Sequence, residues 1–310
     1  MSDLIFHHYP GSPFSEKVRL IFGLKRLPWR SVHIPVILPK PDVVALTGGY
    51  RKTPLLQIGA DVYCDTSLIS RVIERIAPEP TLYPREVAGA AQILAHWADT
   101  TLFWAVVPYV MQPQAFPFIF KGVPAEVIQA FGTDRAAFTA GMRRQTPVDA
   151  KAQLHSYLAW LESQLSDGRE WLTGGAPSIA DFSVGHCMWY VRRASNMAVI
   201  LEGFPRLSSL ADRVLAIGHG TSEPMSSAQA IEIAAKSTPR PCEVRPGMGF
   251  EAGQSVTVCA NDYGTDPVEG VLVGLSDDEV AITRTDARAG TLVVHFPRIG
   301  FQIKAAKPQA

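Results

Sequence analysis

This 310-residue sequence has little of three things, and each scarcity excludes a class of protein. It has no net charge, because 29 Lys and Arg balance 29 Asp and Glu, which argues against nucleic acid or an anionic membrane as a partner. It has no run of about 18 apolar residues, the length that a membrane helix needs. Its most apolar stretch, Thr101 to Met111, is interrupted by Pro108 and is predicted to be a buried helix.

Cysteine is also scarce, with four residues in the whole chain and no CxxC spacing. This pattern fits a reducing compartment and argues against a zinc site. His7 and His8 are adjacent in a predicted strand, so they face opposite sides and do not favour a shared metal ion. The first six residues show neither the basic start nor the cleavage site of a secretory signal. We therefore expect a cytoplasmic protein without a metal.

The first third of the chain alternates between strand and helix patterns. Proline and glycine punctuate the apolar runs, and the periodicity changes between two and 3.6 residues. The predicted elements are a strand at 4–9, a helix at 14–23, a strand at 31–36, a hairpin at 53–64 and a helix at 66–76. The first two strands should pair in parallel through a right-handed crossover. The order is therefore βαβ followed by ββα.

Two proline-rich breaks divide the remainder. Beyond the linker at 78–84, long amphipathic helical patterns run from residue 88 to about 235. Beyond a second break at 237–247, the pattern changes to alternation, with about five short strands. The predicted fold class is multidomain: an α/β domain at 1–80, an all-helical domain at 88–236 and a small β-barrel at 247–304. Because a core of about 55 residues is marginal alone, we expect the barrel to pack on the helical domain or a second subunit.

Three local motifs, in this order, resemble those of the cytosolic glutathione transferases. The segment 10–20, PGSPFSEKVRL, is similar to the active-site turn of the tau class and, with serine replacing cysteine, of the omega class. The segment 51–56, RKTPLL, is similar to the family's cis-proline segment. Asp65-Thr66 begins a predicted helix where the family more often has Glu-Ser. The resemblance covers residues 1–235 and implies a thioredoxin-like first domain.

A fourth match lies in the helical region and concerns folding. The segment 171–181, WLTGGAPSIAD, resembles the family's N-capping box. Ser178 can accept a hydrogen bond from an exposed backbone amide while Asp181 reaches back to the cap residue. A helix is therefore predicted to begin directly after Ser178.

The resemblance implies that glutathione is the co-substrate and assigns a role to each matched residue. Ser12 would donate a hydrogen bond to the glutathione sulfur at a helix N-terminus, where a thiolate is favoured. Pro54 would be cis and would turn the Thr53 backbone toward the tripeptide, whereas sequence alone favours a trans proline at the start of an edge strand. Asp65 would pair with the γ-glutamyl ammonium, and Thr66 with its carboxylate, while both also suit ordinary helix capping.

The other site residues have stronger alternatives. Lys40 and Lys52 are candidates for the glycyl carboxylate, although the sequence favours a solvated surface lysine at each position. Tyr9 is the alternative thiol donor, although the register of the Ser12 motif favours Ser12. The possible acceptor pocket comprises aromatic residues that would also suit a core: Tyr9, Phe14, Phe103, Trp104 and Tyr109.

The function implied is conjugation of glutathione to a small electrophile, or isomerisation of one, by a homodimer. A serine at position 12 argues against disulfide exchange through the protein itself. The alternative is a non-catalytic binding or scaffold protein that keeps the fold. A chain that ends at Thr238 is expected to fold and to keep every predicted glutathione contact.

Overall fold

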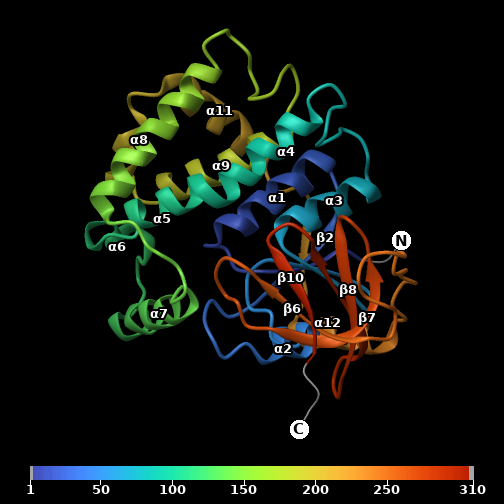
Figure 1. Cartoon of the computed structure of the whole chain (residues 1–310). Helices are drawn as coiled ribbons and strands as arrows, with labels where there is room; N and C mark the ends of the chain where they lie inside the picture. The colour runs from blue at the N-terminus through green and yellow to red at the C-terminus, as the bar shows by residue number, and fades with distance from the viewer. Residues whose placement is uncertain (1–2, 307–310) are drawn as a thin grey trace.

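The computed structural model describes residues 3–306 and begins with the predicted thioredoxin-like unit (Figure 1). Its elements are β1 (Ile5–His8), α1 (Pro13–Lys25), β2 (Trp29–His33), α2 (Pro41–Thr47), β3 (Leu55–Ile58), β4 (Asp61–Cys64) and α3 (Thr66–Ile76). β1 pairs in parallel with β2 and antiparallel with β3, which pairs antiparallel with β4. The predicted order of strands and helices is confirmed, with one addition, the short helix α2.

Helix α2 lies where the sequence indicated only a loop. It begins at Pro41, whose fixed φ suits the first turn, and ends at Gly48, whose φ of 78° is left-handed. A seven-residue helix is too short to show helical periodicity, so its capping residues were its only signal. α2 lies on the face of the sheet opposite α1 and α3, in the second of the molecule's two buried clusters.

The helical region packs around α9. Its elements are α4 (Ala88–Trp97), the π-helical turn η1 (Ala98–Leu102), α5 (Phe103–Val110), the 3-10 turn η2 (Pro113–Ala115), α6 (Phe116–Ile119), α7 (Ala125–Phe138), α8 (Pro147–Gln164), α9 (Ile179–Arg192), α10 (Ser195–Ala198), η3 (Val199–Leu201) and α11 (Pro205–Ala216). The Asp181 carboxylate accepts hydrogen bonds from the amides of Ser178 and Leu172, each at 2.8 Å, so the predicted cap is present. No helix within residues 3–306 combines the length and apolarity needed to cross a bilayer. Helix α7 stands apart from the bundle (Figure 1).

Two elements after α11 return to the sheet. β5 (Ser222–Pro224) pairs in parallel with the outer edge of β2, and α12 (Ser227–Lys236) packs against α2 and β9. The Gln57 side chain of β3 donates to the Ala230 carbonyl of α12 at 2.8 Å. The last part of the predicted helical span therefore covers the thioredoxin-like sheet.

The C-terminal strands form the predicted small β domain, but they are attached elsewhere than expected. β6 (Ser255–Ala260), β7 (Val268–Leu275), β8 (Glu279–Asp286), β9 (Gly290–Pro297) and β10 (Phe301–Ala305) lie in the order β10-β6-β7-β8-β9. β9 then pairs in parallel with β4, so all ten strands belong to one sheet. The expectation that this domain packs on the helical domain or a second subunit missed this sheet, although the β6–β7 connection does contact α7, where the Gly264 amide donates to the Phe138 carbonyl at 3.0 Å.

The physical reason is that β4 has a free edge and an apolar face. Val62 of β4 stands opposite Val294 of β9, and both are fully buried in the same cluster as Phe296. A strand edge leaves backbone donors and acceptors unpaired, and a partner strand satisfies them. The small domain thus obtains a core that it is too small to build alone.

A buried polar group also joins the two parts. The imidazole of His295 in β9 lies between Asp61 of β4, with Nε2 2.9 Å from Oδ1, and Glu279 of β8, with Nδ1 2.6 Å from Oε1. Its ring stacks on that of Tyr63 with centroids 4.4 Å apart. Burial lowers the pKa of His295, but the hydrogen bonds to Asp61 and Glu279 outweigh it and raise the pKa above its ordinary value.

Candidate functional site

Ser12 lies at the point where the first strand gives way to α1. Its side chain is 2% exposed, and its Oγ accepts a hydrogen bond from the Ser15 amide at 3.2 Å, so it is the N-cap of α1. The hydroxyl proton is not used in that bond. Tyr9 lies beside it: burial raises the pKa of the Tyr9 phenol, and both Arg135 and Ser12 oppose the rise. Both candidate thiol donors are therefore at the same place.

The segment 51–54 follows the pattern implied by the resemblance. The Thr53–Pro54 peptide bond is cis. Lys40 is 3% exposed and donates to the Arg51 carbonyl at 3.4 Å and to Thr53 Oγ1 at 3.3 Å. Burial lowers the pKa of Lys40 to about 8. Lys40 is therefore not a solvated surface lysine, and its ammonium supports the segment that carries Thr53.

Asp65 and Thr66 line a smaller cavity of about 150 Å³, with Lys17 and Asp99. Asp65 caps α3, accepting from the Ser67 amide at 2.8 Å and from Ser67 Oγ at 2.7 Å. Its φ of 72° lies in the region that favours glycine. A non-glycine residue held there costs free energy, and such residues concentrate at functional sites. This observation supports a binding role for Asp65 beyond capping.

Lys52 is engaged by a loop from the C-terminal strands. Its Nζ lies 2.6 Å from Asp262 Oδ1 and 3.9 Å from the centre of the Tyr263 ring. Both residues belong to the β6–β7 connection, and the amide of the following Gly264 donates to the Phe138 carbonyl of α7 at 3.0 Å. The loop therefore joins α7 to the thioredoxin-like domain across the site, and sequence reasoning did not place it there.

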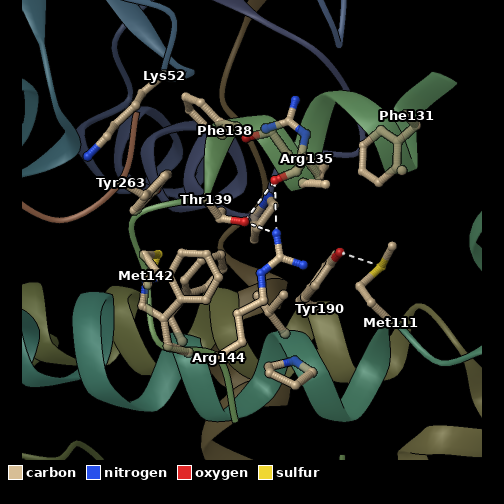
Figure 2. Close-up of a pocket in the computed structure, with 18 of the residues that line it drawn as sticks. Lys52, Met111, Phe131, Arg135, Phe138, Thr139, Met142, Arg144, Tyr190 and Tyr263 are labelled. Carbon is tan, nitrogen blue, oxygen red and sulfur yellow. Dashed lines mark hydrogen bonds between the residues drawn. The ribbon is translucent and has the colours of Figure 1, made fainter. Parts of the chain in front are cut away.

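A larger cavity of about 880 Å³ opens beside Ser12, between α5, α7 and the thioredoxin-like domain (Figure 2). Most of the predicted acceptor residues line it: Tyr9, Phe14, Phe103 and Trp104. Tyr109 belongs to the core instead, because its side chain is 4% exposed and its hydroxyl donates to the Met197 carbonyl at 2.8 Å. Phe14, Lys52 and Tyr263 line both cavities and so separate them.

Sequence reasoning missed the wall that α7 and the segment after it provide. The residues of this wall include Phe131, Arg135, Phe138, Thr139, Met142, Arg143 and Arg144. Its only signal in the sequence is a pair of adjacent arginines at 143 and 144 without a helical pattern. Among residues 3–306, no group of three or more His, Cys, Asp or Glu is gathered to hold a metal ion.

Two family descriptions match the chain: "Glutathione S-transferase, N-terminal domain" over residues 6–81 and "Glutathione S-transferase, C-terminal domain" over residues 125–213. Together they span more than half of the chain, which therefore belongs to the glutathione S-transferase superfamily. A GST-like protein from Pseudomonas syringae is 43% identical, with a TM-score of 0.83, and the alignment covers 99% of this chain and 100% of that one. The C-terminal strands thus fall within the shared structure.

Two further relatives match less of the chain. FtsZ-localized protein A from Caulobacter vibrioides is 27% identical over 182 residues, which are 57% of this chain and 72% of that protein. A glutathione S-transferase from Rhodospirillum rubrum is 20% identical with a TM-score of 0.52, covering 69% of this chain and 88% of that one. At that identity, the second likeness concerns the fold alone.

Proposed function

We propose that the chain is a glutathione-dependent transferase that conjugates glutathione to a small electrophile or isomerises one. The observation that carries this proposal is the Ser12 hydroxyl, which caps α1 and lines the large cavity. A helix N-terminus offers backbone amides and a favourable dipole to an anion. In our proposal Ser12 donates to the glutathione sulfur, and Tyr9 is the alternative donor.

The tripeptide would lie across both cavities. The Thr53 backbone, presented by Pro54, would pair with the cysteinyl backbone like an added strand. Asp65 would hold the γ-glutamyl ammonium, and the α3 N-terminus with Thr66 its carboxylate. Lys52 pairs with Asp262, so it would bind the glycyl carboxylate only after releasing the Asp262 carboxylate.

Stabilising the thiolate supplies only part of any rate enhancement. If the thiol pKa fell by about two units from about 8.5, the thiolate fraction at pH 7 would rise roughly 25-fold. Intrinsic nucleophilicity would fall roughly eightfold for the same shift, which leaves a gain of about threefold. Orientation of the electrophile in the large cavity must therefore provide most of the rest.

Calorimetric titration with glutathione, followed by thiol consumption with a panel of electrophiles, tests this function. Ser12→Ala should raise the pKa of the bound thiol, measured by thiolate absorbance, and should lower turnover while affinity stays within about threefold. Ser15→Ala, which removes a neighbouring buried hydroxyl, is the matched control and should change neither the pKa of the bound thiol nor the turnover. If Ser12→Ala kept the wild-type thiol pKa and turnover, Tyr9 would be the donor to test.

Asp65→Asn tests the placement of the γ-glutamyl end. Asparagine preserves the helix cap and tolerates a positive φ, so this variant removes little besides the charge. The loss of a charge-assisted hydrogen bond should weaken glutathione binding by about 1.5 to 3 kcal/mol. An unchanged dissociation constant would rule out this placement.

The remaining parts of the proposal are a cytoplasmic, detoxifying homodimer. The homodimer rests on the family likeness, and Ile93 on α4, which is 74% exposed, is the position chosen to test an interface on this helix. Light scattering should give the mass of a dimer for the wild type and of a monomer for Ile93→Glu. A monomeric wild-type protein would contradict this part.

The second candidate is a non-catalytic binding or scaffold protein. Two observations favour it: the engagement of Lys52 by Asp262 and Tyr263, and the likeness to a protein named FtsZ-localized protein A. The same titration separates the candidates, because a scaffold that has lost its glutathione site gives no binding heat and consumes no thiol.

A further inference from the structure

The turn at residues 9–12 is held by two arginines that have no part in the chemistry proposed above. The amide of its last residue donates to the carbonyl of its first at 3.2 Å, which closes the turn between β1 and α1. The two carbonyls inside the turn accept from guanidinium groups. Arg19 Nη2 donates to the Pro10 carbonyl at 3.1 Å, and Arg193 Nη1 donates to the Gly11 carbonyl at 2.9 Å. Both inner carbonyls are therefore bound by arginine.

The contact made by Arg193 fixes the orientation of Ser12. The Gly11 carbonyl and the Ser12 amide belong to one planar peptide group. Its N–H donates to the Tyr9 carbonyl and its C=O accepts from Arg193, so the plane is held at both ends. A Cβ at position 11 would lie 3.0 Å from Nη1 of Arg193, so the guanidinium packs directly on the turn. The direction of the Ser12 side chain therefore depends on Arg193.

The two arginines differ in how their charge is compensated. Arg19 is 5% exposed and pairs with Glu16, with Nη2 2.6 Å from Oε2. Arg193 is half-buried, and its Cζ lies 5.3 Å from the centre of the Trp189 ring. Within residues 3–306 its guanidinium forms no ion pair. The positive charge of Arg193 therefore acts on the turn without a carboxylate to offset it.

Arg193 belongs to the helical domain, at the C-terminus of α9, which runs alongside α1 (Figure 1). Its charge reaches two phenols near the turn. Burial raises the pKa of Tyr9 and raises that of Tyr190 to about 12, and Arg193 is among the charges that oppose both rises. The other charged or titratable groups that act on the turn, directly or through Arg19, are His8, Glu16, Asp134, Arg135 and His219.

The geometry points to Arg193 as a positioning residue for this turn: its guanidinium orients the Gly11–Ser12 peptide, and its charge stabilises an anion at the Ser12 side chain. The helical domain thereby contributes to a site whose other residues come from the thioredoxin-like domain. The effect on glutathione rests on the transferase proposed above, in which the anion is the thiolate of the tripeptide. The effect on the turn itself does not, so it can be measured without glutathione.

The first test places a thiol at position 12 of the full chain. In Ser12→Cys the pKa of the new thiol is measured by ultraviolet absorbance of the thiolate, after subtraction of the wild-type signal. Adding Arg193→Gln should raise this pKa by about 0.5 to 1 unit, because a nearby cation favours the charged form. Arg193→Lys keeps the charge and should restore at least half of the difference. Arg193→Gln breaks one described hydrogen bond of a half-buried residue, so the fold should be kept, as circular dichroism verifies.

The neighbouring arginine of α9 supplies the control of equal charge. Arg192 pairs with Asp212 at 2.6 Å and makes no contact with the turn within the described residues. In the Ser12→Cys background, Arg192→Gln should leave the thiol pKa within about 0.2 unit, because an exposed charge is screened by solvent and salt.

The second test uses glutathione and the native Ser12. Arg193→Gln should raise the pKa of the bound thiol by a similar amount. Turnover should therefore fall about threefold to tenfold at pH values below that pKa and recover as the pH rises above it. Affinity for S-methylglutathione, which has no thiol to ionise, should stay within about twofold. A merely structural role of Arg193 would instead lower turnover at every pH and weaken binding of this analogue.

Three outcomes would overturn the proposal. The first is an unchanged thiol pKa when Arg193→Gln is added to Ser12→Cys. The second is an equal rise in the Arg192→Gln control, which would assign the effect to net charge. The third is a pKa in Arg193→Lys as high as in Arg193→Gln, which would mean that the charge plays no part. A wild-type chain that does not bind glutathione would refute the transferase, whereas the Ser12→Cys comparison would still decide the role of Arg193.

Discussion

The two ends of the chain contribute to one sheet and one site in different ways. The thioredoxin-like end supplies Ser12, Thr53 and Asp65 from strand and helix termini, positions fixed by backbone geometry. The C-terminal end supplies the loop that carries Asp262 and Tyr263, together with Ile299, Gly300 and Phe301 at the smaller cavity, while its strand β9 pairs with β4. In the proposed function the first region carries the chemistry of the site, whereas the second region pairs with β4 and covers the site.

The largest expected effect comes from removing the second region. A chain ending at Thr238 would expose the β4 edge and the buried faces of Val62 and Cys64, which share a cluster with the C-terminal strands. Uncovering several such side chains, at about 1.5 to 3 kcal/mol each, approaches the whole stability of a typical domain. The sequence-based expectation was a folded chain with lower solubility or thermal stability; we now predict a larger effect, an insoluble or largely unfolded product, measured by circular dichroism and thermal melting. A soluble truncated chain with a wild-type melting temperature would show that the first region does not depend on the second for its stability.

A smaller change tests whether the two regions unfold together. Phe296 is fully buried and contacts Tyr50 of the thioredoxin-like domain, with ring centres 5.8 Å apart. Phe296→Ala should lower the free energy of unfolding by about 3 to 5 kcal/mol in a single transition. Val271→Ala, at a half-exposed position on β7, should change it by less than about 0.5 kcal/mol. Two separate transitions in urea would show that the regions are independent units.

The sequence predicted what depends on local chemistry. The turn at Ser12 and the cap at Asp181 each follow from a few adjacent residues, whereas the cis bond before Pro54 was expected from the family resemblance alone. The pairing of β9 with β4 could not be predicted in this way. The two strands are separated by about 230 residues in the sequence, and many apolar strands would fit either edge. Tyr109 was predicted to line the pocket but lies in the core, because an aromatic residue at helical spacing suits a core and a pocket equally.

The wall that α7 and the segment after it provide was not predicted from the sequence, for a related reason. Arg135, Arg143 and Arg144 read as ordinary exposed charges until α7 is placed against the loop carrying Tyr263. That placement depends on Gly264, whose φ of 56° and close approach to the Phe138 ring favour a residue without a side chain. These arginines line one cavity only because the tertiary contact between a helical segment and a C-terminal loop holds α7 in place.

Stability should depend on pH through His295, which joins the two regions. Its pKa is raised by Asp61 and Glu279, so the stabilisation is fully present below about pH 6.5 and is lost as pH rises through the folded-state pKa. The stability difference between wild type and His295→Gln should therefore be larger at pH 6 than at pH 8.5, as measured by urea unfolding.

Among residues 3–306, three other buried histidines act in the opposite direction. Burial lowers the pKa of His7 to about 4 and that of His8 to about 3, and it also lowers the pKa of His186, so all three reduce stability as pH falls below about 6.5. They are common to wild type and variant and cancel in the difference. A difference that is constant from pH 6 to pH 8.5 would mean that His295 acts only through neutral hydrogen bonds.

The smallest expected effect concerns the loop that covers the site. Asp262 is partly exposed and pairs with Lys52, so Asp262→Asn should change the free energy of unfolding by less than about 1 kcal/mol. The same change releases the Lys52 ammonium from its carboxylate, and glutathione binding should tighten by about twofold to fivefold because the glycyl carboxylate no longer competes for it. Asp266→Asn removes an equal charge from the same loop without breaking an ion pair described in the structure and should leave affinity unchanged. Calorimetry on both variants decides the point. Weaker binding in Asp262→Asn alone would mean that the pair positions Lys52 for glutathione, and the C-terminal region would then belong to the binding machinery rather than to its cover.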